Sequence, residues 1–160
     1  MESKKEIQII KCMRKKKAET TEDSQVNKEL EKKALGGDLA SIKSMLEISA
    51  SNKDLKKIFY WSNILATYDD PVGYYLLGLC YRDGAGVRKS PKKAFESFNT
   101  AANLNHIEAK FNLGRCYVEG IGVDPDLRTG INIMEEAFHD LDKLLVENEK
   151  LIKLINNIEQ

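Results

Sequence analysis

The feature that most constrains this chain is an internal repeat with a period of 36 residues. Residues 73–102 align with residues 109–138 at this offset without a gap. A period of this length is typical of solenoids, in which each unit is one supersecondary structure that buries its apolar face against its neighbours. The matched pairs are Leu77/Leu113, Gly78/Gly114, Cys80/Cys116, Tyr81/Tyr117, Gly84/Gly120, Gly86/Gly122, Val87/Val123, Lys92/Arg128 and Ala101/Ala137.

The glycine-rich segment RDGAGVRKSP, residues 82–91, superficially suggests a phosphate-binding loop. A Walker loop reads GxxxxGK[ST], because glycines let the backbone close on the phosphates in front of the lysine and hydroxyl. With Lys89 and Ser90 in the last two places, the pattern requires glycine where the chain has Asp83 and Arg88. The same layout also recurs 36 residues later as EGIGVDPD. A nucleotide site is therefore rejected.

The repeated unit is instead predicted to be two helices joined by a glycine turn. The helices cover residues 73–83 and 91–103. Gly84 falls where a helix C-terminus favours a left-handed residue. Ser90 and Pro91 suit the N-cap and the first position of the second helix. Because alternating β-branched residues are scarce, we expect the whole chain to be all-α.

Two pairs of segments resemble the Sel-1-like repeat family, which is related to tetratricopeptide repeats. They are LGLCYRDGAGV with KKAFESFNTAA, and LGRCYVEGIGV with RTGINIMEEAF. The resemblance implies a short α-solenoid of antiparallel helix pairs that acts as a non-enzymatic scaffold or adaptor for a protein or peptide partner. The chain departs from the family pattern at Ser90, Thr129, Gly130 and Phe138, so the last helix pair is expected to be less regular.

Four segments are expected along the chain. Residues 1–22 form a basic tail. Residues 23–72 contain a leading helix and a degenerate repeat, for which residues 37–48 and 53–66 have the right helix lengths. Residues 73–138 hold the two repeats, and residues 139–160 form a C-terminal helix.

Apolar residues of the C-terminal segment step by three and four along the chain. A capping helix that covers the end of the array is the favoured interpretation. A coiled coil that joins two copies through residues 141–160 is the alternative, with Asn148 as a buried polar residue that selects one register. The stripe comprises Met134, Ala137, Leu141, Leu144, Asn148, Leu151, Ile155 and Ile158.

The concave face of the array is the predicted partner-binding surface. In helical repeats the first helices line this face, and the resemblance implies that partners are held there. Aromatic residues and arginines are common anchors of interfaces. An equally weighted alternative assigns part of the set to the core. The candidate residues are Tyr75, Leu79, Arg82, Phe111, Arg115 and Val118.

The N-terminal tail carries a local positive charge in a chain of zero formal net charge. Residues 1–17 hold seven basic groups and two acidic ones, a balance of 7 − 2 = +5. A solvated tail is the default interpretation. Contact with RNA or a ribonucleoprotein through phosphates is the functional alternative, as is an acidic membrane surface. The basic groups are Lys4, Lys5, Lys11, Arg14, Lys15, Lys16 and Lys17.

No set of residues predicts catalysis, a metal site or a cofactor. His106 and His139 are expected to be structural or exposed. Cys80 and Cys116 occupy equivalent repeat positions and are expected in the core, with a redox pair as the alternative. An odd number of cysteines without CxxC spacing suits a reducing compartment. Since no apolar run is long enough for a membrane span or a secretory signal, we expect a cytoplasmic or otherwise intracellular protein.

Overall fold

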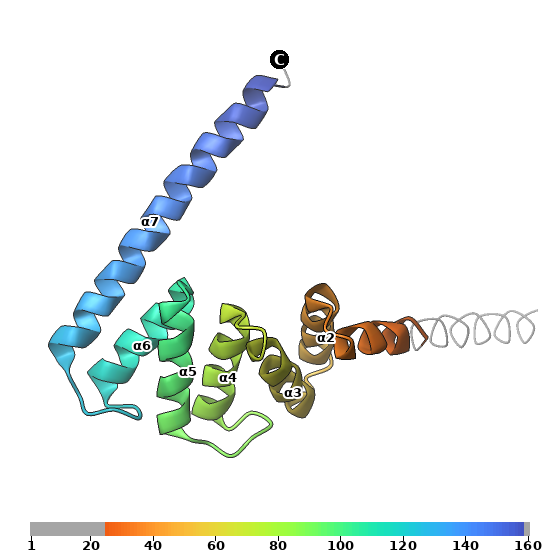
Figure 1. The fold of residues 1–160 in the computed structure, drawn as a ribbon. Helices are drawn as coiled ribbons and strands as arrows, with labels where there is room; N and C mark the ends of the chain where they lie inside the picture. The colour runs from red at the N-terminus through yellow and green to blue at the C-terminus, as the bar shows by residue number, and fades with distance from the viewer. Residues whose placement is uncertain (1–24, 159–160) are drawn as a thin grey trace, which may run out of the picture. The chain divides into compact units, whose positions relative to one another are not determined.

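A computed structural model describes residues 25–158, and within the last helix it describes no side chains at positions 151 and 153–158. The chain divides into two compact units, residues 1–48 and 49–160, and each is considered by itself. All regular secondary structure in the described residues is helical (Figure 1). The predicted all-α class is confirmed.

The first unit contains a helix over residues 25–35 and the start of α2 (Leu39–Ser51). A left-handed Gly37, with φ of 91°, separates the two helices. Asp38 caps α2 by accepting a hydrogen bond from the backbone N–H of Ser41 at 3.0 Å. Ile42 is fully buried. The helix over residues 25–35 therefore ends at a glycine turn.

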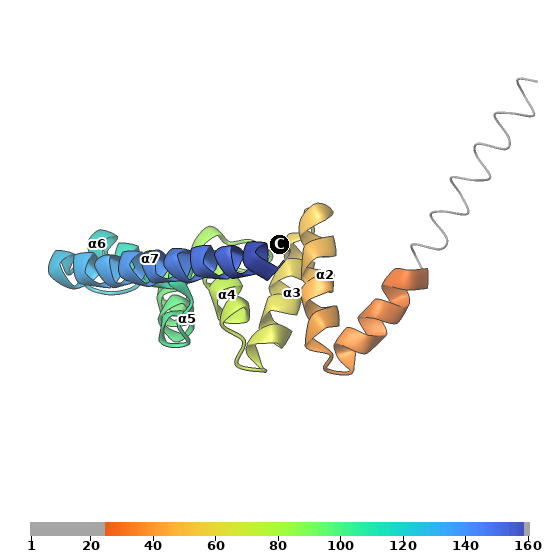
Figure 2. The same cartoon turned by 90° about the horizontal axis from the view of Figure 1, so that it is seen from above.

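The second unit is a series of helices that pack on one another in chain order. They are α3 (Leu55–Ala66), α4 (Pro71–Asp83), α5 (Pro91–Asn103), α6 (Ile107–Glu119) and α7 (Leu127–Ile158). Each of these helices contacts the next one along the chain. Figures 1 and 2 show α4, α5 and α6 side by side in this order. The predicted solenoid of helix pairs is confirmed.

The turns inside the two helix pairs have the predicted capping groups. Gly84 and Gly120 end α4 and α6 in the left-handed conformation, with φ of 75° and 69°. The Ser90 hydroxyl accepts a hydrogen bond from the N–H of Lys93 at 3.4 Å, and Pro91 begins α5. In the second copy the carboxylate of Asp126 accepts from the N–H of Thr129 at 3.0 Å. Local sequence therefore decides where these helices end and begin.

A second glycine in each turn connects one helix pair to the preceding one. A Cβ atom at Gly86 would lie 2.2 Å from the carbonyl oxygen of Leu55, at the start of α3. A Cβ atom at Gly122 would lie 2.2 Å from the carbonyl oxygen of Pro91, at the start of α5. Leu55 and Pro91 are themselves 36 residues apart. The start of α3 therefore contacts the turn of the first repeat in the same way as the start of α5 contacts the turn of the second repeat.

The last helix combines the second helix of the second repeat with the C-terminal segment. Its first part packs on α6, where Gly130 and Ala137 are buried. Residues 142–150 are exposed, and α7 continues well past α6 (Figure 1). The end of the array is thus covered by residues 127–141. Residues 142–150 lie beyond the part of α7 that packs on α6.

Two alanine substitutions in the turn after α4 can separate the effect on stability of its contact with α3 from the effect of backbone strain. Gly84 and Gly86 both have positive φ, 75° and 72°, but the nearest atom to a Cβ at Gly84 lies 3.5 Å away. Gly84→Ala should therefore cost about 1 kcal/mol of strain alone. Gly86→Ala should cost about 3 kcal/mol, because overpacking is added. Urea unfolding measures both, and equal losses would contradict the contact.

Candidate functional site

The six predicted partner-binding residues lie on equivalent positions of α4 and α6. Tyr75, Leu79 and Arg82 are spaced by four and three residues along α4, which places them on one side of that helix. Phe111, Arg115 and Val118 repeat this spacing on α6. We call these six positions the first-helix face. The structure shows which of them pack within the chain and which are accessible.

Arg82 links the two helices of this face. Its guanidinium donates two hydrogen bonds of 2.8 Å to the carboxylate of Asp83. A third hydrogen bond of 3.1 Å runs to the side-chain oxygen of Asn112 on α6. The hydrogen bond from Arg82 holds the pKa of the Asp83 carboxyl below its usual range. Arg82 is therefore oriented before any partner arrives, and Asn112 is a member of the site that sequence reasoning missed.

Tyr75 and Leu79 mainly serve the packing of the array. The Tyr75 ring stacks on the imidazole of His106, with centroids 4.5 Å apart and 23° between the planes. Nδ1 of His106 accepts a hydrogen bond of 3.3 Å from the N–H of Ala109 and so caps α6. Leu79 packs against the buried core cluster. These contacts agree with the alternative that assigned part of the set to the core, and His106 has the structural role predicted for it.

The three residues on α6 differ in accessibility. Phe111 packs edge-to-face on Phe138 of α7, with ring centroids 4.7 Å apart. A Cβ at Gly130 of α7 would lie 2.6 Å from a methyl carbon of Val118, so these two elements are in close contact. The side chain of Arg115 is 50% exposed and forms an ion pair of 3.2 Å with Glu119, one turn away. Arg115 is thus the most accessible charged group of the face.

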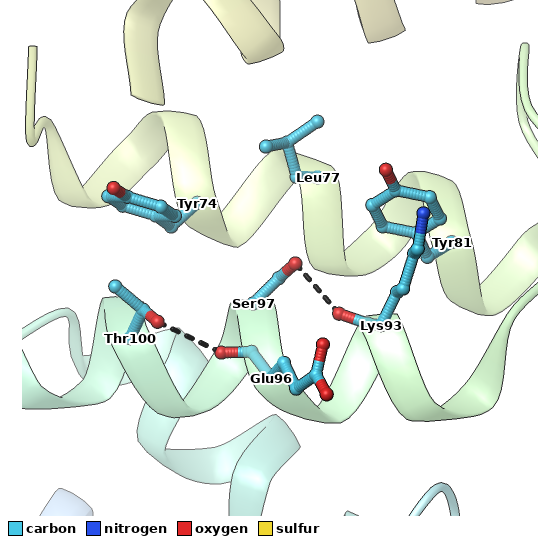
Figure 3. Close-up of a pocket in the computed structure, with 7 residues that line it drawn as sticks. All are labelled: Tyr74, Leu77, Tyr81, Lys93, Glu96, Ser97 and Thr100. Atoms are coloured by element: carbon cyan, nitrogen blue, oxygen red, sulfur yellow. Dashed lines mark hydrogen bonds between the residues drawn. The ribbon is translucent and has the colours of Figure 1, made fainter. Parts of the chain in front are cut away.

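A small cavity between α4 and α5 is a second candidate site (Figure 3). Its volume is about 270 Å³. The ammonium group of Lys93 lies over the ring of Tyr81, 5.3 Å from the centroid. The hydroxyl of Ser97 donates to the carbonyl oxygen of Lys93 at 2.8 Å and is thereby occupied within its own helix. The lining residues are Tyr74, Leu77, Tyr81, Lys93, Glu96, Ser97 and Thr100.

The residues that line this cavity are not all repeated in the second repeat. At the 36-residue offset Tyr74 is replaced by Lys110 and Lys93 by Thr129. Lys110 is already engaged, because its ammonium group forms an ion pair with Asp140 of α7. In the sequence, the cavity could have been recognised only from these differences between the two repeats at its lining positions. The arrangement offers the ammonium group of Lys93, the carboxylate of Glu96 and two aromatic rings.

Cys80, Cys116 and His139 have structural or exposed positions in the described residues. Cys80 and Cys116 are buried free thiols, and burial raises the pKa of Cys80 to about 11. Burial also raises the pKa of Cys116. His139 is exposed. No cluster of three or more potential metal ligands occurs in residues 25–158, and no helix there is both long and apolar enough to cross a membrane.

The seven basic residues of the tail, from Lys4 to Lys17, lie outside the described residues. Their proposed contact with polyanions therefore rests on the sequence alone. Cys12 also lies outside the described residues.

Comparison with known proteins identifies the repeat. Residues 71–106 and 107–138 each match the model of the Sel1 repeat. A Sel1 repeat protein from Oxalobacter formigenes has a similar structure, with 27% identity and a TM-score of 0.60 over 64% of this chain and 43% of the other. The protective antigen c5321 of uropathogenic Escherichia coli, which displays an SLR fold, shares 20% identity and a TM-score of 0.59 over 80% of this chain and 32% of its own. This chain thus spans less than half of either protein. No curated protein sequence gives a significant match.

Because Cys80 and Cys116 are buried, we expect their thiols to react slowly with alkylating agents. A thiol with a pKa of about 11 is almost entirely protonated at pH 8, whereas only the thiolate reacts with alkylating agents. Cys80 and Cys116 should therefore resist iodoacetamide at pH 8 in the folded protein and react readily in urea. Peptide mass spectrometry measures both. Rapid alkylation of the folded chain, or a disulfide between the two thiols under mild oxidation, would restore the redox-pair alternative.

Proposed function

Because residues 71–138 form two Sel1 repeats, we propose that the chain is a non-enzymatic adaptor that holds a protein or peptide partner on its first-helix face. Sel1 repeats generally serve as scaffolds for protein interactions. A role for this face in particular is our own inference. We propose it as the concave face on which the resemblance places partners.

The observation that carries the proposal is a row of oriented polar groups on α4 and α6. Arg82 is fixed by Asp83 and donates to Asn112, and Arg115 lies one turn beyond Asn112 on the same helix. Ion pairs within the chain position both guanidinium groups. A partner that carries carboxylates or backbone carbonyls therefore meets donors that lose little conformational entropy on binding.

The face is tested by charge reversal at its most accessible member. Arg115→Glu should weaken binding of the native partner about tenfold, as expected for an interface arginine. Arg128→Glu, which changes an exposed arginine at the start of α7, is the matched control and should bind normally. The partner is first identified by photo-crosslinking from position 112 and then measured by calorimetry. Equal binding by both variants, with helicity retained, would count against the face.

A second candidate function rests on the charge of the tail. As the functional alternative to a solvated tail, the balance of +5 within 17 residues would contact RNA or another polyanion. This contact would be independent of the first-helix face, because the two features lie in separate parts of the sequence.

Binding of a single-stranded RNA oligonucleotide distinguishes this candidate from the first. If all seven basic residues contact phosphates, log K should fall with log salt with a slope of about −5. Removal of residues 1–17 should abolish the binding and leave recognition of the protein partner unchanged. Binding that survives this truncation, or that ignores salt, would exclude the tail as the contact.

A further inference from the structure

The second half of α7 presents exposed apolar side chains that no described residue of the chain covers. Residues 142–150 are all exposed, although the helix continues to Ile158. Leu144, Leu145, Val146 and Ile152 are 46%, 54%, 50% and 57% exposed. We call residues 141–158 the free half of α7. Exposed apolar side chains that gather on one helix are typical of an interaction surface, so a packing partner is expected for the free half.

The apolar residues of the free half lie mainly on one side of the helix. Leu141, Leu144 and Asn148 follow the spacing of a coiled-coil seam, and the sequence continues it at positions 151, 155 and 158. Leu145 and Ile152, seven residues apart, flank this seam on one side. The result is a stripe wider than that of a two-position seam. Val146 lies on the opposite side of the helix.

On the N-terminal side of residue 141, α6 already packs against the same seam. A Cβ at Gly114 of α6 would lie 2.5 Å from Cγ of Met134 and 2.8 Å from the carbonyl oxygen of Gly130. Ala137, the next seam residue, is completely buried. The seam is therefore occupied within the chain as far as Ala137, half-buried at Leu141 and open from Leu144 onward. An occupant must fit the open part without entering the part that α6 fills.

We propose that the free half of α7 pairs with the free half of a second copy of this chain in antiparallel orientation. A parallel copy in register would place its own residues 127–140 where α6 lies. In the antiparallel arrangement Leu141 of each copy faces residue 158 of the other. The repeats of the second copy then lie beyond the open end of the first helix, and the contact is twofold symmetric and closed.

The flanking residues favour the same orientation. In antiparallel coiled coils the equivalent flanks of the two helices meet each other, so Leu145 of one copy lies near Ile152 of the other. In a parallel pair the flank of one helix meets the opposite flank of its partner, and Leu145 would face Asp140. The antiparallel pair therefore buries an apolar flank against an apolar flank. The two Asn148 side chains lie in neighbouring layers beside the twofold axis, where their amides can pair.

Molecular mass in solution tests the dimer. The chain should sediment at twice its mass of 18.1 kDa at high concentration and dissociate on dilution. Leu144→Asp should give a monomer with lower helicity, because the free half loses its partner. Val146→Asp is the matched control, since Val146 is equally exposed but lies away from the seam, and it should remain dimeric. A monomeric wild-type chain at about 100 μM would falsify the proposal, as would equal dissociation of both variants.

Disulfide trapping tests the orientation. In the antiparallel register, position 144 of one copy faces position 155 of the other. With Cys12→Ser as background, a mixture of Leu144→Cys and Ile155→Cys chains should form a disulfide-linked heterodimer on oxidation. Leu144→Cys alone should not crosslink, since its two copies would be 11 residues apart along the axis, about 16 Å. Crosslinking of Leu144→Cys alone would show a parallel pair, and a dimer that crosslinks in neither experiment would overturn the register.

Discussion

The architecture of residues 49–158 depends on a contact between backbones that leaves no room for a side chain. The turn after α4 rests on the carbonyl oxygen of Leu55 at Gly86, and the turn after α6 rests on that of Pro91 at Gly122. Because backbone geometry is the same in every unit, this contact sets one fixed spacing between successive helix pairs. The aromatic contacts follow from it. Phe59 meets Tyr81 at 5.6 Å and, 36 residues later, Phe95 meets Tyr117 at 5.4 Å in the same edge-to-face geometry.

The same geometry explains why α7 differs from α3 and α5 in how it can be packed by a following helix. At the position where α3 and α5 have Ala66 and Ala102, each only 6% exposed, α7 has Phe138, which is 57% exposed. A small residue there allows the next first helix to approach, and a phenylalanine prevents such close packing. Phe138 instead covers the ring of Phe111, as His106 covers the equivalent ring of Tyr75. One large side chain thus replaces a contact that a further repeat would make.

The sequence was sufficient to predict the helix pairs, their glycine turns and their caps, because these depend on residues close together in the chain. It also placed Cys80 and Cys116 in the core through their equivalence. It did not predict that Arg82 reaches Asn112, since that hydrogen bond joins residues 30 positions apart in sequence and depends on the distance between α4 and α6. The sequence also could not distinguish the accessible residues of the first-helix face from those that pack against other helices of the chain. Whether residues beyond 141 fold back depends on tertiary contacts that a 3-4 spacing alone does not specify.

The two repeats share their scaffold but not their surface chemistry, and this difference bears on recognition. The identical positions, such as Gly78 and Gly114, serve packing. On the first-helix face the equivalent pairs differ, with Leu79 opposite Arg115 and Arg82 opposite Val118 in the alignment. The arginines therefore lie at different heights on the two helices. A surface of identical units would accept a partner in more than one register, whereas unequal units penalise every shift by one repeat. Under the proposed function, the loss of repetition on this face would therefore restrict a bound partner to one position.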